Sequence, residues 1–248
     1  MQFMEYGVQN SDVIVLLHGG GLAPWNYYEE ANLLKDKFRI IIPILDGHSG
    51  SDRNFASIEG NAHALIDFID ESFGGKVLLI GGLSLGGQIL VEILSQRKDI
   101  CKFAVIESAL VLPMPFTSML IKPAFSLCYS LVKTRWFAKL QFKSLHICPT
   151  FFEDYFRDTA VITKENMISF LMANANYKMK NSLSECQAKV LVLVGDREQK
   201  IMKKSSEMIT QQIQNAELTI LPDYFHGDLS INHADKYVTK VLDLIYHG

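Results

Sequence analysis

The stretch KVLLIGGLSLGGQILVEIL, residues 76–94, joins an apolar run to an amphipathic segment through a glycine-rich turn. The apolar residues at its start predict a buried strand, and the spacing that follows predicts a helix over residues 85–97. Ser84 stands at the centre of the turn, flanked by Gly82 and Gly86. Small neighbours let a strand and a helix pass close together, so that the turn can present the serine hydroxyl outward. The pattern therefore predicts a reactive serine at the junction of a strand and a helix.

Apolar runs and helix-like segments alternate on both sides of this unit. The run Val13–Leu17 has no polar alternation, which is typical of a strand covered on both faces in a parallel sheet. Ser57 is a good helix N-cap, and the pair Gly74–Gly75 is a good helix stop. A short edge strand is expected at Gln2–Tyr6. Further strands are predicted at 39–45, 76–81, 102–108, 188–195 and 216–222, and further helices at 25–38, 58–73, 203–213 and 233–247. The alternation predicts an α/β fold, a doubly wound and mostly parallel sheet with right-handed crossovers.

Residues 112–186 interrupt this alternation. They contain four prolines, many aromatic residues and a helical pattern over 161–179. We therefore expect a helical cap inserted between two strands of the sheet. Residues 1–111 and 187–248 would form the core domain, and residues 112–186 would form the cap or lid.

The composition excludes several classes of protein. Hydrophobic residues make up 48% of the chain and charged residues 21%, values typical of a globular protein and not of a disordered one. The net charge of −3, without a basic run, argues against a nucleic-acid partner. The His and Cys residues lack the spacing of metal ligands, so no metal is expected.

The expected location is cytoplasmic. Four cysteines without a Cys-x-x-Cys pair suit a reducing compartment, and the first dozen residues lack the pattern of a secretory leader. Residues 109–132 are apolar over the length of a membrane span, but three prolines and Lys122 interrupt them. No stable membrane insertion is therefore predicted.

Residues 82–86 match the motif G-x-S-x-G in the strand–turn–helix setting that a nucleophile elbow requires. On this motif and on the order of its parts, the whole chain resembles the α/β-hydrolase family. The resemblance implies the α/β-hydrolase fold with a helical cap and assigns Ser84 as the nucleophile. It also gives the segment LLHGGGL, residues 16–22, the role of the oxyanion loop. The amides of Gly20 and Leu85 would then form the oxyanion hole, with Gly21 as a weaker candidate and His18 in a structural role.

A serine nucleophile needs a histidine as its base. Among seven histidines, His226 follows the last predicted strand, and FHGDLS, residues 225–230, resembles the family's final histidine loop. Gly227 would permit a tight exit into the last helix. His48 is expected to make structural hydrogen bonds near the site. The other histidines are interpreted as packing or surface residues.

The acid of the site has three candidates. Family members usually carry an aspartate three residues after the glycine that ends the strand at 188–195, and here that position is Glu198. Asp196 is the second candidate. Glu107, at the end of an earlier strand, is the third, because some family members take the acid from there. With either of the first two, the chain order serine, acid, histidine matches the family.

The resemblance implies a serine hydrolase that cleaves a carboxylester-type bond of a small to medium, partly apolar substrate through an acyl-enzyme. It implies no cofactor and a small-molecule substrate as partner, and it leaves the oligomeric state open. Two alternatives remain. One is a ligand-binding or signalling protein of the same fold with little turnover, and the other is a membrane-associated, lipase-like enzyme that docks through the lid. Gly21, Leu22 and Trp25 are expected to line the substrate pocket. An apolar roof over Ser84 is predicted from Phe116, Met119, Leu120, Phe125, Leu127, Trp136 and Phe137.

Overall fold

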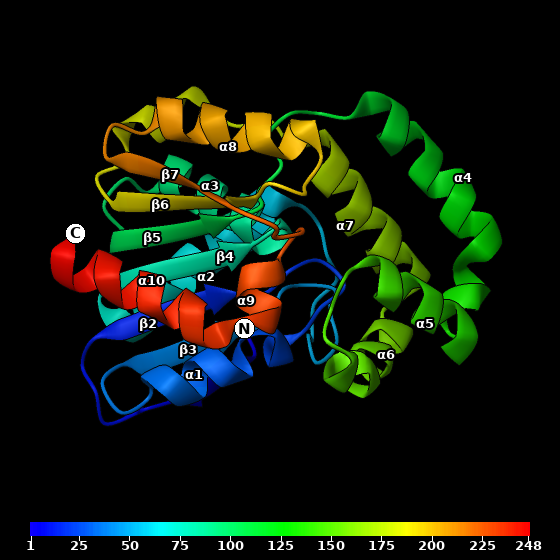
Figure 1. The fold of residues 1–248 in the computed structure, drawn as a ribbon, viewed down its shortest axis with the longest axis horizontal. Helices are drawn as coiled ribbons and strands as arrows, with labels where there is room; N and C mark the ends of the chain where they lie inside the picture. The colour runs from blue at the N-terminus through cyan, green and yellow to red at the C-terminus, as the bar shows by residue number, and fades with distance from the viewer.

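A seven-stranded sheet runs through the centre of the protein, and a group of helices stands to one side of it (Figure 1). The computed structural model describes residues 1–248. The strands are β1 Phe3–Tyr6, β2 Val13–Leu17, β3 Arg39–Pro43, β4 Val77–Leu83, β5 Cys101–Glu107, β6 Lys189–Gly195 and β7 Ala216–Leu221. The α-helices are α1 Tyr28–Leu34, α2 Ile58–Phe73, α3 Leu85–Gln96, α4 Pro115–Val132, α5 Arg135–Ser144, α6 Phe152–Val161, α7 Lys164–Asn176, α8 Lys200–Gln212, α9 Asp228–Asn232 and α10 Ala234–His247.

The strand order is β1-β3-β2-β4-β5-β6-β7. Only β1 runs antiparallel, against β3, and every other pair is parallel. After β2 the chain first adds β3 on one side and then β4 on the other. The loops at the carboxyl ends of these strands therefore diverge, and such a switch point is where open α/β sheets bind ligands. The predicted doubly wound, mostly parallel sheet is confirmed.

Helices cover both faces of the sheet (Figure 1). Successive residues of a strand point to opposite faces, and β2 shows this directly. Val13 and Val15 pack in the same buried cluster as residues of α2, α3 and α8. Ile14 and Leu16 pack in a second cluster with residues of α1 and α10. Every side chain of β2 is buried, which explains why its sequence has no polar alternation.

The residues predicted to begin and to end helix α2 do so in the structure. The Ser57 hydroxyl oxygen accepts a hydrogen bond from the Gly60 amide at 2.9 Å, and Gly74 ends the helix in the left-handed conformation with φ 68°. The helix expected at 25–38 is instead a 3-10 turn at Pro24–Tyr27 followed by α1, which ends at Leu34. Two other elements also differ from the prediction. The helix expected at 203–213 begins at Lys200, and the short helix α9 was not predicted because its five residues give no periodic pattern.

Helices α4 to α7 follow β5 and precede β6, and they make up the group at the right of Figure 1. Helix α4 lies against α7, where the Asn176 amide donates to the Ser118 hydroxyl at 2.6 Å. The Tyr129 hydroxyl also donates to the carbonyl of Ile162, at 2.5 Å. None of the helices combines the length and the apolar character needed to span a bilayer.

The predicted apolar roof over Ser84 is wrong. The predicted residues of α4 and α5 do not line a cavity at Ser84. Phe125 and Phe137 are partly buried against the core, and the other five point to solvent. Helix α4 has a neighbour on one side only, so its apolar sequence does not imply burial.

Candidate active site

Ser84 occupies the sharp turn between β4 and α3. Its backbone has φ 52° and ψ −110°, a strained conformation for a residue with a side chain. The turn tolerates only glycine at two neighbouring positions. A Cβ on Gly82 would lie 2.5 Å from the carbonyl oxygen of Gly86, and a Cβ on Gly86 would lie 2.2 Å from that of Leu17. Strand and helix therefore approach as closely as the sequence pattern predicts, and the serine side chain is left free at the turn.

His226 lies beside this turn, on the loop after β7. Its Nε2 atom is 2.9 Å from the Ser84 hydroxyl oxygen, and its Nδ1 atom is 2.8 Å from a carboxylate oxygen of Glu198. Gly227, with φ 71°, turns the chain directly into α9. A tautomer with the proton on Nδ1 satisfies both contacts, because Nδ1 then donates to Glu198 and Nε2 accepts from Ser84. The three segments that the sequence singled out therefore meet in one place.

Glu198 is held by several donors. Its Oε1 atom accepts a hydrogen bond from the Ser108 hydroxyl at 2.7 Å and one from the Gly195 amide at 2.8 Å, while Oε2 faces His226. Burial would raise the pKa of Glu198. The hydrogen bond and charge of His226, with the Gly195 and Ser108 hydrogen bonds, outweigh burial and lower that pKa. The carboxyl is thus kept ionised, as a group that orients an imidazole requires.

Neither alternative acid contacts His226. Asp196 accepts a hydrogen bond from the Asp223 amide at 2.7 Å, at the surface. Glu107 is buried below α9, where it accepts a hydrogen bond from the Ser230 amide at 3.4 Å. Burial raises the pKa of Glu107 to about 7, although hydrogen bonds from Ser230 act against it. The geometry favours Glu198 among the three candidates.

The backbone amides of Gly20 and Leu85, near Ser84, donate no hydrogen bond within the chain. Leu85 is the first residue of α3, where the helix dipole adds partial positive charge. The Gly21 amide is different, since it donates to the Nε2 atom of His48 at 3.0 Å. Gly21 therefore cannot serve as an oxyanion donor in this conformation, because its backbone N–H is already hydrogen-bonded to His48.

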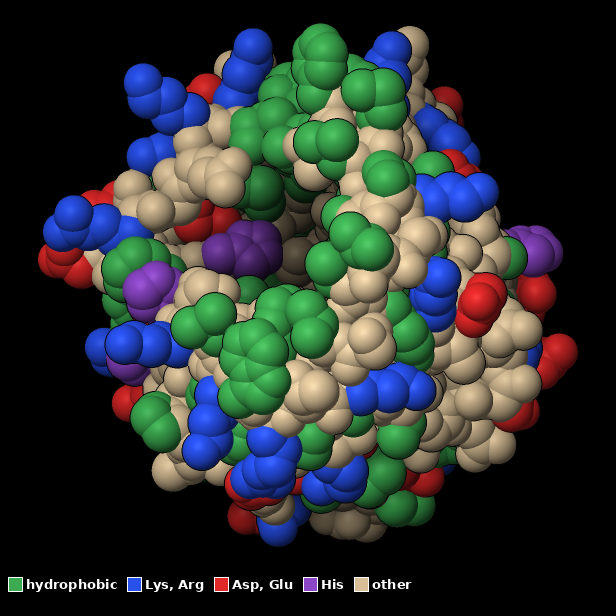
Figure 2. Space-filling model, turned by 90° about the vertical axis from the view of Figure 1, so that its right-hand side faces the viewer, with side chains coloured by type: hydrophobic (Ala, Val, Ile, Leu, Met, Phe, Trp, Pro, Cys, Tyr) green, Lys and Arg blue, Asp and Glu red, His purple; other side chains and the backbone are tan.

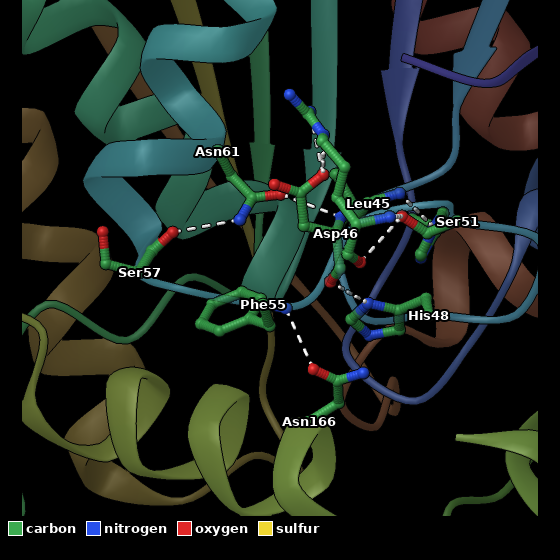
Figure 3. A network of polar contacts seen from close by, with 10 residues as sticks. Leu45, Asp46, His48, Ser51, Phe55, Ser57, Asn61 and Asn166 are labelled. Carbon is green, nitrogen blue, oxygen red and sulfur yellow. Dashed lines mark hydrogen bonds and ion pairs between the residues drawn. The ribbon is translucent and has the colours of Figure 1, made fainter. Parts of the chain in front are cut away.

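The loop after β3 holds His48 in position (Figure 3). The Nδ1 atom of His48 donates to the carbonyl of Asp46 at 3.0 Å, and the Asp46 amide donates to Asn61 of α2 at 3.0 Å. Farther along the loop, the Phe55 amide donates to Asn166 of α7, also at 3.0 Å. This loop links the glycine segment after β2 to the core helix α2 and to α7.

His18 and His48 are structural acceptors, in line with the sequence interpretation. The Nε2 atom of His18 accepts a hydrogen bond from the Leu45 amide at 3.2 Å. Burial, helped by the nearby His48, lowers the pKa of His18 to about 3, and burial lowers the pKa of His48 to about 4. Both rings are therefore neutral near pH 7 and can accept from backbone N–H groups.

Two cavities meet at Ser84 and His226, and a histidine is visible in the hollow of the surface in Figure 2. The first has a volume of about 200 Å³ and mostly apolar walls, and it is lined by Gly19, Gly20, Leu22, Leu83, Ser84, Leu85, Leu145, Ile147, Phe170, Leu171, Asn174, His226 and Ile231. The second has a volume of about 520 Å³ and adds polar residues from two segments, Ser144 and His146 from one and Arg197, Glu198 and Gln199 from the other. The site can thus hold an apolar group on one side of the serine and a more polar group on the other.

Of the three residues expected in the pocket, Leu22 lines the first cavity, whereas Gly21 and Trp25 do not line it. Trp25 is buried and stacks on Phe151, with ring centroids 5.5 Å apart, because the segment before α6 covers it. Gly21 is turned toward α6, where its carbonyl accepts a hydrogen bond from the Thr159 hydroxyl at 3.1 Å.

The sequence analysis missed several residues of the site. Ser108 directly follows β5, and its position at the carboxyl end of a strand could have marked it. Phe170, Leu171 and Asn174 of α7 line the cavities, but nothing in their local pattern separates a lining residue from a packing one. No group of three or more His, Cys, Asp or Glu side chains is arranged to hold a metal ion.

Known proteins share this fold. A family model described as "Alpha/beta hydrolase family" matches residues 14–234. A thermophilic esterase from Thermogutta terrifontis is 18% identical, with a TM-score of 0.81 over 99% of this chain and 93% of that one. An enol-lactonase from Burkholderia xenovorans LB400 is 17% identical, with a TM-score of 0.82 over 98% and 95%.

A bromoperoxidase from Bacillus anthracis is 15% identical and has a TM-score of 0.83 over 98% of this chain and 94% of that one. At these identities the structures show the shared fold alone, and their different names show that it carries more than one reaction. The family match covers most of the sequence, including the elbow at Ser84 and the loop of His226. The chain belongs to the alpha/beta hydrolase family.

Proposed function

We propose that this protein is a serine hydrolase that cleaves a carboxylester-type bond through an acyl-enzyme. The observation that carries the proposal is the continuous hydrogen-bonded chain from Ser84 through His226 to Glu198. Beside it lie two free amides, those of Gly20 and Leu85. A nucleophile, a base oriented by an acid and a pair of unpaired donors are the groups that acyl transfer requires.

In the proposed reaction, His226 takes the proton of Ser84 at Nε2 while the serine oxygen attacks the acyl carbonyl. Glu198 stabilises the imidazolium through Nδ1. The oxyanion forms between the amides of Gly20 and Leu85. The alcohol then leaves with the proton from Nε2, and a water molecule activated by His226 releases the acid and restores the serine.

The two cavities support a substrate that is partly apolar. The smaller one is lined by the oxyanion segment and by aliphatic and aromatic side chains, so we assign it to the acyl group. The larger one has more polar walls and is assigned to the leaving group. An esterase and an enol-lactonase are among the proteins of similar fold, and both names agree with an ester substrate. The four cysteines of this chain are free, and free thiols suit a reducing compartment, so we propose a cytoplasmic location.

Turnover of short-chain aryl esters by the wild type and by Ser84→Ala tests this proposal. The variant should lose activity by at least about 10³-fold, because the nucleophile is gone. Its melting temperature should stay unchanged, since the hydroxyl group makes no structural contact other than that with His226. A folded wild type without turnover of any ester in the series would favour the binding protein considered above.

A further inference from the structure

Exposed apolar side chains are concentrated on one part of the molecule. Seven of the fifteen large apolar residues that are exposed lie between residues 116 and 145. They include the two most exposed, Leu127 at 84% and Phe116 at 81%. Figure 2, which views the side of the molecule carrying α4 to α7, shows hydrophobic side chains gathered around the hollow. Folded monomers rarely leave such a group uncovered without a binding role.

The apolar side chains of α4 form a stripe along the helix. Phe116, Met119, Leu120 and Leu127 share one face, because residues three, four and seven positions apart superimpose on a helix. Ser118 and Ile121 lie on the opposite face and are buried. The stripe therefore points away from the rest of the protein, and no other segment of the chain covers it.

The same segment is strongly basic, although the whole chain carries a net charge of −3. No aspartate or glutamate occurs from residue 108 to residue 152, and five cationic residues do: Lys122, Lys133, Arg135, Lys139 and Lys143. Arg135 pairs with Glu153 just outside this range. The four lysines are exposed and form no ion pair. The apolar stripe thus belongs to a segment that carries four exposed lysines without an ion-pair partner.

We propose that the exposed face of α4 and α5 docks on the surface of an anionic lipid bilayer. Apolar side chains of an amphipathic helix can enter the boundary between headgroups and acyl chains, while lysines around them pair with lipid phosphates and carboxylates. A symmetric contact with a second copy is disfavoured, because it would bring the four unpaired lysines of both chains together. The proposal concerns binding and does not depend on the proposed hydrolase reaction.

Docking on this face would also turn the cavities at Ser84 toward the bilayer. Leu145 belongs to the exposed apolar group and lines both cavities that meet at Ser84. The openings of the cavities therefore lie beside the docking face. A substrate dissolved in the bilayer would reach the serine from there without crossing water.

Sedimentation with lipid vesicles tests the proposal. The wild type and Ser84→Ala are mixed with vesicles of phosphatidylcholine alone and with vesicles that also contain phosphatidylserine, at low and at raised salt. Both proteins should pellet with the anionic vesicles only, and raised salt should release them. Lys122→Glu should weaken the partitioning by about fivefold or more, because each cation near an anionic surface strengthens binding by about that factor. Leu127→Ser should weaken it as well, with hydrolysis of a water-soluble aryl ester unchanged.

Matched controls come from helices on the other parts of the molecule. Leu33 of α1 is 57% exposed, and Lys204 of α8 is exposed. Leu33→Ser and Lys204→Glu should pellet like the wild type. The proposal is overturned if the wild type stays in the supernatant, if Leu127→Ser pellets as well as Leu33→Ser, or if Leu127→Ser dissociates a dimer. Pelleting without ester turnover would refute the proposed function and support docking.

Discussion

Strand β2 and helix α4 are both built from apolar sequence, but their surroundings differ. All five side chains of β2 are buried, whereas only three of the eighteen residues of α4 are. The strand lies between two helical layers, and α4 has the rest of the protein on one side only. Hydrophobic sequence is therefore a reliable sign of burial where the topology supplies cover on both sides. At the edge of the molecule it indicates a surface that another partner can cover.

The largest expected effect is a loss of catalytic rate from substitution of Glu198, at the carboxyl edge of the sheet. Glu198→Gln should lower kcat by about 10³- to 10⁴-fold in ester hydrolysis, because the amide no longer fixes the histidine tautomer or stabilises its charge. Asp196→Asn is the matched control and should stay near wild type, since Asp196 faces the Asp223 amide and not His226. The reverse ranking of the two variants would move the acid to Asp196.

A paired truncation sharpens the comparison between sheet and insertion. Leu79 of β4 is fully buried, and Leu127 of α4 is 84% exposed. Leu79→Ala should lower the free energy of unfolding by about 2–5 kcal/mol, from lost burial and the cavity left behind. Leu127→Ala should change it by less than about 0.5 kcal/mol. Chemical denaturation of both variants gives the two values. A loss of similar size at Leu127 would mean that α4 is covered in solution.

A smaller effect is expected from Glu107, the buried carboxyl below α9. Burial raises its pKa from the ordinary 4.5 to about 7, so the folded state binds a proton that the unfolded state has released. The wild type therefore loses stability as pH rises through this window, by up to about 3 kcal/mol. Glu107→Gln removes the ionisable group and should gain stability relative to wild type between about pH 4.5 and 7.

Denaturation of Glu107→Gln and of the wild type across this pH range checks the prediction. Glu207→Gln, at an exposed position of α8, is the control and should show no such gain. An advantage of Glu107→Gln that shrinks as pH rises would contradict the stated sign.

The sequence predicted most of the sheet, because a doubly covered strand needs a continuous apolar run and a nucleophile elbow needs its glycines. Ser84 and His226 were predicted from their positions at strand ends and from the family resemblance, whereas Glu198 was one of three candidates for the acid, and the structure places it beside His226. The differences between the expected and the observed pocket have a common physical origin. Trp25 and Gly21 were assigned to the pocket from local sequence, but their environments are set by Phe151 and His48, which are distant along the chain.

The insertion was harder to predict for the same reason. The apolar side chains of α4 and α5 were expected to roof the serine, whereas Ile147, Phe170 and Leu171 line the cavity instead. Which face of a helix meets the core depends on how the helix is placed, and helical periodicity defines the faces without choosing between them. Ser108 escaped notice because its role depends on the register between β5 and β6.

Mass spectrometry of the protein after reaction with a fluorophosphonate probe tests the central claim most directly. The account predicts a single phosphonyl group on the peptide that carries Ser84, and no labelling of Ser84→Ala, whose fold is intact. Labelling of Ser84→Ala as complete as that of the wild type, or a wild type whose Ser84 stays unmodified, would contradict it.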